Sequence, residues 1–401
     1  MNDHANLKFL YFLDSSQACF RLHVAYIVLF VMGNLISPPQ DTLLLVPPRI
    51  STRGLTRPIE VENPMSVYFG NLFRREVLHD LHSFRGSFGL DFLMTPEQPP
   101  TTAAHVSLNG STLKKTVDGG SLNLHINSQI SPSVHGLGRL TLGTGSGVTG
   151  YAMLSSDFDR GRLSFTAGSD GPGNHRVGFR AQSSSFLFGS EVPIADPRKV
   201  SAWVISRVSR DFTVGVSGSP LEPSAPVEIS MSLDRRVPGT DSTYCISSTI
   251  RSPSNELTVG FSQHLVTHRK VYNIFEDKRV KFIANYIDIA VEATSGPENT
   301  AAVAAGVSWQ PNKNLLAKIH VSTDRGAVAT VAVRNWWVPS VLACVSTGVD
   351  VSGSPFVGGR FQLSNWLTRV EYQPGQPISE LPTTRWMSIE DLSRFSSSNR
   401  L

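Results

Sequence analysis

The chain has 401 residues, of which 40% are hydrophobic and only 17% are charged, and its formal net charge is +4. Soluble domains usually carry about 25% charged residues, and a mean hydropathy of -0.07 is low for a bundle of apolar membrane helices. Without a dense Lys or Arg block, direct nucleic-acid binding has no support. The cysteines, Cys19, Cys245 and Cys344, are scattered and odd in number, which argues against a disulfide framework or a CxxC zinc site.

Residues 1–62 are expected to form a partly disordered N-terminal extension. The apolar run Leu22 to Ile36 is short for a membrane helix and contains His23. Our interpretation is that residues 1–31 are poorly ordered or an artefact of gene prediction, with Met32 as an alternative start. From Met32 the chain reads Met-Gly-Asn-Leu-Ile-Ser, which fits the N-myristoylation pattern.

A short helix is expected next, within residues 63–85. From Ser66 to Leu81, apolar side chains recur at helical spacing and share one face: Phe69, Leu72, Phe73 and Val77. Such a face packs on a core or on the inner wall of a barrel, and the favoured interpretation is a helix in the barrel lumen.

Beyond Arg85 the hydrophobic period changes from 3.6 to 2. From Ser121 to Ile130, apolar residues alternate with polar ones, which predicts a strand with one apolar and one wet face. The same alternation recurs around Phe165, Phe179, Met231, Ile319 and Val331.

Short turn signals separate these segments, which run about 9–11 residues, the length that crosses a bilayer when tilted. About nineteen strands are expected within residues 86–364. No gap leaves room for a helical crossover, so the sheet should be an antiparallel meander. The charged stretch Val266 to Lys281 is expected to be a loop with a helical turn.

A transmembrane β-barrel is favoured over a soluble β-sandwich. So many strands in one meander would close or split, and the wet faces carry Arg, Asn, Gln and Ser at strand centres, as a water-filled lumen requires. Aromatics near strand ends suit interfacial girdles, namely Tyr151, Trp203, Tyr244, Trp309, Trp336 and Trp337. The predicted fold is therefore an all-β barrel with a short helix in its lumen.

Three stretches within residues 63–364 carry a family resemblance. They are Asn63-Pro64 followed by Leu72-Phe73-Arg74-Arg75-Glu76 and Phe84 to Phe92; Gly120-Ser121-Leu122-Asn123 with Gln129-Ile130-Ser131-Pro132; and Gly358-Gly359-Arg360-Phe361-Gln362-Leu363. The chain resembles the mitochondrial porin superfamily. It is more similar to the central pore subunits of the outer-membrane protein translocase than to the voltage-dependent anion channels. The long N-terminus, the Val266–Lys281 stretch and a tail over residues 365–401 depart from that family.

The resemblance implies an integral protein of the mitochondrial outer membrane that imports precursor proteins, in a hetero-oligomeric complex with receptors and small helical translocase subunits. It also implies a last-strand sorting signal at Gly358, Phe361 and Leu363, although Phe356 occupies the position where that signal has a polar residue. Two alternatives stay open: a metabolite or anion porin, and a porin-like barrel that acts as a structural membrane anchor.

No catalytic or cofactor motif is evident. His264 and His268 lack an HExxH context, and Gly143 to Gly147 lacks the Lys-Ser/Thr of a phosphate loop, so neither an enzyme nor a metal or cofactor is predicted. A pore selects by width and wall charge. The candidate pore-lining residues are Arg162, Arg176, Arg180, Glu228, Asp234, Lys318, His320 and Arg334.

The tail begins with Pro374, Pro377 and Pro382, which prevent another paired strand. Ser388 to Asp391 then resembles a helix start. The short helix that follows would need a docking surface to be stable. A disordered end is the alternative.

Overall fold

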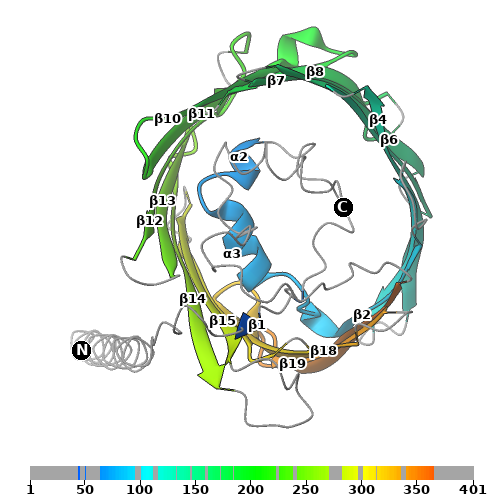
Figure 1. The fold of residues 1–401 in the computed structure, drawn as a ribbon, viewed down its shortest axis with the longest axis vertical. Coiled ribbons are helices and arrows are strands. Elements are labelled where there is room, and N and C mark those ends of the chain that lie inside the picture. The colour runs from blue at the N-terminus through cyan, green and yellow to red at the C-terminus, as the bar shows by residue number, and fades with distance from the viewer. Residues whose placement is uncertain are drawn as a thin grey trace, which may run out of the picture.

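In the computed structural model, nearly all of the regular structure is β-strand, and the strands form one closed ring (Figure 1). The structure describes residues 44–45, 50, 64–94, 101–111, 116–131, 133–144, 147–158, 161–171, 173–183, 185–222, 225–237, 242–270, 282–296, 301–312, 314–335 and 340–364. Most of the predicted N-terminal extension, including Met32 and the myristoylation pattern, and the whole tail lie outside these residues. Among the described residues, no helix is both long and apolar enough to span a membrane.

The barrel consists of nineteen strands, which confirms the expected number. Their bounds are β2 Ser87–Met94, β3 Thr101–Ser111, β4 Thr116–Ser131, β5 Val134–Gly143, β6 Gly147–Phe158, β7 Gly161–Ser169, β8 His175–Ser183, β9 Phe186–Pro193, β10 Ser201–Arg207, β11 Phe212–Gly218, β12 Val227–Arg236, β13 Thr243–Ser252, β14 Glu256–Lys270, β15 Phe282–Ser295, β16 Ala301–Gln310, β17 Leu315–Ser322, β18 Gly326–Asn335, β19 Ser340–Val349 and β20 Pro355–Ser364. A further short strand, β1 (Leu44–Leu45), pairs in parallel with β15.

The sheet is a meander in which each strand pairs antiparallel with the next, except where the ring closes. There β2 and β20 pair in parallel, with Phe88 opposite Gly359 and Leu93 opposite Ser364. The prediction of a purely antiparallel barrel was therefore wrong at this one pair. In a meander of alternating direction, an odd number of strands gives the first and last strand the same direction, so a closed barrel must contain one parallel pair.

Apolar side chains face outward and polar side chains face inward, as the alternation predicted. On β4, inward-facing Asn123 is 3% exposed, whereas outward-facing Ile126 is 53% exposed. The same inversion holds for β7, where Ser164 is buried and Phe165 is exposed. This distribution, opposite to that of a soluble protein, is typical of barrels in a bilayer.

The aromatic girdle is only partly as expected. Trp309 is exposed on the outward face, but Trp203 is 3% exposed and faces the lumen. Tyr151 also falls on the inward phase of β6, which it shares with the buried residues Met153 and Ser155. The alternation within the strand, and not the aromatic character, decides which face these side chains occupy. Trp336 and Trp337 lie outside the described residues.

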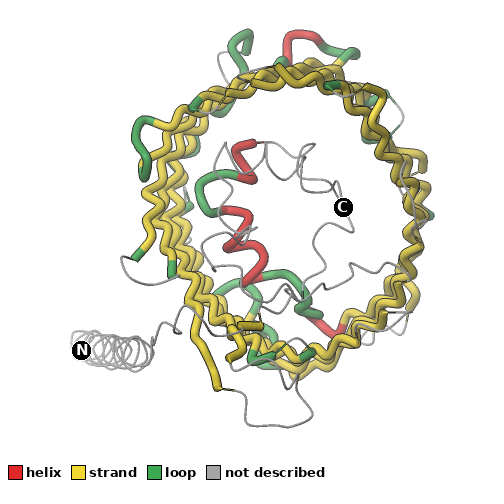
Figure 2. The backbone as a smooth tube through the Cα atoms, viewed as in Figure 1, coloured by secondary structure: helices red, strands yellow, loops and turns green. Residues whose placement is uncertain are grey.

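The predicted helix from Ser66 to Leu81 is two short helices, α2 (Pro64–Val67) and α3 (Asn71–Leu78), inside the ring of strands (Figure 2). The break has a backbone cause, because Phe69 and Gly70 both have positive φ, at 62° and 69°. The helix ends at Leu78, and Leu81 has a positive φ as well. Its position in the lumen agrees with the prediction.

The expected loop from Val266 to Lys281 was also partly wrong. Residues 266–270 continue β14, which pairs with β15 as far as Lys270 opposite Phe282. On its other side, β15 pairs with β16 only from Tyr286 to Ser295. The first residues of β15, Phe282 and Ile283, pair instead with Leu44 and Leu45 of β1. Some of the charged residues that suggested a loop therefore lie in β14, where β14 and β15 extend beyond the neighbouring strand β16. Residues 271–281 lie outside the described residues.

Candidate functional site: the lumen and its docked segment

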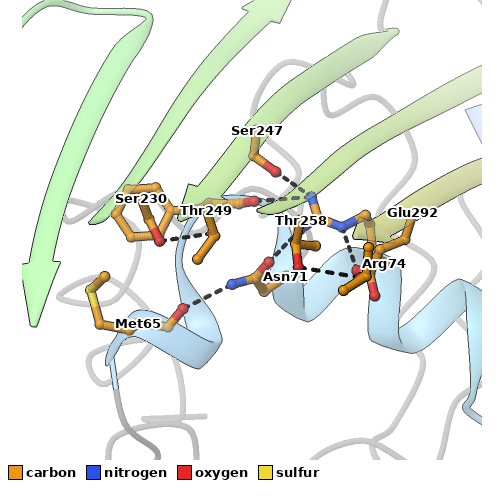
Figure 3. Close-up of polar contacts among 10 residues, drawn as sticks. Met65, Asn71, Arg74, Ser230, Ser247, Thr249, Thr258 and Glu292 are labelled. Atoms are coloured by element: carbon orange, nitrogen blue, oxygen red, sulfur yellow. Dashed lines mark hydrogen bonds and ion pairs between the residues drawn. The ribbon is translucent and has the colours of Figure 1, made fainter. Parts of the chain in front are cut away.

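The lumen contains a segment of the chain that is fixed to one side of the wall. This docked segment, residues 64–83, comprises α2, α3 and the turn that follows. Its helices contact β11, β14, β15 and β16. A single arginine, Arg74, makes the central polar contact between the segment and the wall (Figure 3).

Arg74 is 2% exposed and donates to groups on both the wall and the segment. Its Nε donates to Glu292 Oε2 at 3.1 Å, and its Nη1 donates to Ser247 Oγ at 2.7 Å. Nη1 also donates to the Phe69 carbonyl at 3.1 Å, and Nη2 donates to Asn71 Oδ1. The guanidinium thus joins the α2–α3 turn to β13 and β15, and its positive charge is paired with a carboxylate.

Glycines on the wall make room for the docked segment. A Cβ at Gly260 would overlap the Arg74 guanidinium, and a Cβ at Gly215 would overlap the Phe69 ring. A Cβ at Gly306 would lie 2.9 Å from Leu78 Cδ2. Because these glycines come from three different strands, they make a depression that matches the outline of the segment. In strands, such glycines commonly mark a place where another group approaches closely.

Apolar side chains complete the part of the wall that receives the docked segment, which we call the seat. Met65, Phe69 and Leu72 of the segment form a buried cluster with Trp203 and Ile205 of β10. Further along, Phe73, Val77 and Leu78 form another buried cluster with Ala290 of β15. Burial of a large apolar side chain contributes about 1.5–3 kcal/mol, so these clusters stabilise the docked position.

The end of the segment is held by polar groups of the wall. Lys318 of β17 is 3% exposed, and its Nζ donates to the carbonyls of Glu76 and Asp80, both at 2.6 Å. These carbonyls lie at the C-terminal end of α3, where helix carbonyls lack partners within the helix and a cation is favourable. Ser83 N donates to Ser346 Oγ at 3.0 Å, which fixes the following turn.

Three histidines meet where the segment leaves α3. The His320 ring lies 5.8 Å from the rings of both His79 and His82 and 5.2 Å from Phe84. Burial lowers the pKa of His79, and it lowers the pKa of His82 from 6.5 to about 2, with the Lys318 charge acting in the same direction. Both rings are therefore neutral at physiological pH. Among the described residues, no group of His, Cys, Asp and Glu is arranged to hold a metal ion.

All the predicted pore-lining residues fall on the inward phase of their strands. Lys318 and His320 are not open to the lumen, because they lie beneath the docked segment. Arg180 lies over the ring of Trp203, at 5.9 Å from the ring centroid. Asp234 accepts a hydrogen bond from Ser232, and Arg334 lies on the inward phase of β18. The others, Arg162, Arg176 and Glu228, take part in ion pairs with neighbouring wall residues.

Several charged residues of the wall are paired with a residue of opposite charge. Arg162 binds both oxygens of Asp157, at 2.5 and 3.1 Å, and Arg176 lies 3.3 Å from Asp170. Arg251 bridges Glu228 and Glu256, at 3.1 Å from each. Between the charges the inward surface consists largely of neutral hydroxyl and amide groups, including Ser107, Ser155, Ser164, Ser230 and Thr249.

Polar residues that the sequence did not single out hold the closure of the barrel. Asp91 of β2 is 2% exposed and accepts from Arg360 Nε of β20 at 2.5 Å. The same carboxylate lies 3.0 Å from His105 Nε2 of β3. Further along the wall, Asn123 Oδ1 accepts from Arg139 at 2.6 Å. The two residues His264 and His268, considered for a metal, are on β14, and His264 instead pairs with Asp288 at 2.7 Å.

The proposed sorting residues lie on β20, next to this closure. Phe361 and Leu363 share the outward phase of the strand, and Phe361 is 41% exposed. Gly358 lies on the inward phase, where a Cβ would overlap the Ser87 carbonyl and Ser83. Phe361 and Leu363 therefore face away from the lumen on the closed barrel.

The closed barrel, its inverted polarity and its polar lumen define a porin-like β-barrel. No protein-family model matches the chain, and no curated protein matches it.

Proposed function

We propose that the protein is the protein-conducting pore of the mitochondrial outer membrane and that it imports precursor proteins. The observation that carries the proposal is a closed barrel of nineteen strands with an apolar outer face and a polar lumen in which several charged side chains form ion pairs. The outer face requires lipid, because so much apolar surface is unfavourable in water.

The number of strands supports the mitochondrial location. Bacterial single-chain barrels have even strand numbers, whereas the mitochondrial anion channel has an odd number. An odd number forces the parallel β2–β20 pair, so parity and closure belong together. A mitochondrial outer-membrane barrel is the class that combines both features.

The charge pattern of the wall supports a polypeptide as the cargo rather than a small anion. Selectivity for anions requires positive charges that attract them, and Arg162 and Arg176 are each paired with an acid, Asp157 and Asp170, which weakens their attraction for anions. A wall of hydroxyl and amide groups offers weak hydrogen bonds to any polypeptide and allows it to leave. On this proposal the partners are precursor proteins, receptors and small helical subunits, and the protein carries out no enzymatic reaction.

The test is depletion of the protein followed by import of a radiolabelled presequence protein into isolated mitochondria. We expect import to fall while the membrane potential is maintained, and purified protein in planar bilayers should conduct and be blocked by a presequence peptide. Unchanged import with loss of metabolite exchange would identify a metabolite porin. Unchanged import with unchanged conductance would leave the structural anchor.

A further inference from the structure

We propose that the cluster of His79, His82 and His320 is an acid-sensitive latch that holds the docked segment against the wall at neutral pH and releases it when the rings are protonated. The latch is a property of the segment and its seat and goes beyond the proposed pore function. It would act whatever passes through the lumen.

The hydrogen bonds of His79 require a neutral ring. His79 Nδ1 lies 3.3 Å from Arg325 Nη1. Arginine is only a donor, so Nδ1 must be the acceptor and cannot carry a proton. Protonation would replace this hydrogen bond by an N–H facing a guanidinium, with two positive charges in contact.

His320 is buried and His82 is half-buried, and each has a buried ring nitrogen without a hydrogen-bond partner among the described residues. The Val77 carbonyl favours the charged form of His82, but burial has the larger effect on its pKa. His82 Nδ1 lies 2.7 Å from Thr330 Oγ1, and its Nε2 is buried with no hydrogen-bond partner among the described residues. His320 is 0% exposed, and neither of its ring nitrogens has a partner there. An N–H donor that is buried without an acceptor costs about 1–3 kcal/mol, and more when it carries charge.

The charged groups around the cluster oppose protonation on balance. The positive charges are those of Lys318 on β17 and Arg325 in the β17–β18 turn, which also lies over the Phe84 ring at 5.5 Å. Asp324 of the same turn and Glu292 of β15 act in the opposite direction on His79. Burial and the two cations outweigh these acids, so the pKa of His79 in the docked state is lowered.

The sign of the pH dependence follows from these shifts. In the docked state the pKa of His82 is lowered from its ordinary value of 6.5 to about 2, mainly because the ring is buried. A base with a depressed pKa stabilises the docked state fully above pH 6.5, and docking weakens as the pH falls from 6.5 toward 2. Each pH unit in that window reduces the docking equilibrium constant about tenfold for one such ring. At about pH 4.5, His82 alone would reduce it on the order of 100-fold.

The chain carries its own reporter of docking. Cys245 of β13 is 0% exposed, and a Cβ placed on Gly70 would lie 2.8 Å from its Sγ. The segment therefore covers this thiol, and release should open it to reagents in the lumen. The experiment is thiol labelling of the full-length protein in detergent or liposomes at about pH 7.5 and 4.5. Labelling is assigned to Cys245 by peptide mass spectrometry, and each rate is divided by that of the denatured chain at the same pH.

We expect the normalised Cys245 rate to rise on the order of 100-fold at the lower pH. A variant with His79→Gln, His82→Gln and His320→Gln should show no such rise. His135→Gln is the matched control, because His135 also faces the lumen but pairs with Asp157 at 3.3 Å, away from the segment. It should respond like the natural chain. A flat profile in the natural chain, or a rise that the triple variant keeps, would overturn the latch.

If the triple variant does not insert, His79→Gln and His82→Gln alone still decide the matter, because each should reduce the pH slope. Hydrogen exchange of the α3 amides over the same pH range, corrected for the intrinsic rate, gives an independent measurement. Neither readout needs transport. The two proposals can therefore fail separately. If import does not depend on the protein, the latch is unaffected. If the pH dependence is absent, the depletion assay still decides the import function.

Discussion

Replacing Arg74 tests whether the docked segment is held by a specific seat or only by apolar contact. Arg74→Leu keeps the volume and helix propensity roughly constant but removes every polar contact of the guanidinium. Glu292 Oε2 loses its partner at 3.1 Å and Ser247 Oγ loses its partner at 2.7 Å. The Gly260 depression would no longer be filled by a planar group.

The size of the effect can be estimated from burial. Removing one partner of a buried ion pair costs about 3–5 kcal/mol. The Glu292 side chain is 34% exposed and is partly stabilised by solvent, so the lower end applies, about 3 kcal/mol. At 1.4 kcal/mol for each factor of ten, docking should weaken roughly 150-fold.

The assay is hydrogen exchange of the α3 amides at neutral pH, measured by mass spectrometry on protein in micelles. Their protection should fall roughly 150-fold in Arg74→Leu, whereas the β-strand amides should keep their protection. Arg75→Leu is the matched control, because Arg75 is the adjacent residue and its side chain is exposed. Equal protection in Arg74→Leu and the natural chain would refute the idea that this arginine holds the segment. Equal loss in both variants would mean that helix stability, and not the seat, was measured.

Three further outcomes test the barrel and its assembly. Phe165→Lys should prevent membrane assembly, because Phe165 is 56% exposed on the outward face and a Lys at mid-membrane costs about 2–4 kcal/mol. Thr166→Lys, on the inward face, should assemble, and native gels measure both outcomes. Equal behaviour of the pair would reverse the inside-outside assignment. Gln at both Phe361 and Leu363 should give protein that enters mitochondria but does not assemble, and normal assembly would remove these residues from the sorting signal. Deleting residues 374–401 should leave the barrel inserted but weaken the native complex or shift conductance, and an unchanged complex and conductance would make the tail a passive end.

The strands and their faces could be predicted because they depend on local alternation. The residues from Leu122 to Ile130 place apolar groups on one side whatever their neighbours are, and the structure keeps that assignment. The seat of the helix could not be predicted in the same way. Arg74 meets Glu292 across 218 residues of sequence, and nothing near either residue indicates the partner. The one signal in the sequence was an arginine directly after the apolar pair Leu72-Phe73 in a segment expected to lie in the lumen.

Local patterns also failed where tertiary contacts override them. The periodicity of Ser66 to Leu81 indicated one helix, but the turn at Phe69 and Gly70 lets the segment follow the curved wall, and the docking contacts stabilise that turn. The residues after Val266 looked like a loop because they are charged. They continue a strand because β15 extends equally far and supplies the backbone partners.

The odd number of strands accounts for one feature that local sequence could not indicate. Parallel pairing is slightly less stable per residue than antiparallel pairing, and β2–β20 is the one parallel pair between the described barrel strands. Its side chains offset part of this weakness. Asp91 of β2 joins Arg360 of β20 and His105 of β3 on the lumen side, so the carboxylate ties the closing strands together across the seam. A buried carboxylate on a strand is costly unless it is paired. The partners of Asp91 come from the strands on either side of β2, so this carboxylate stabilises the closure of the barrel and does not act as a free charge in the lumen.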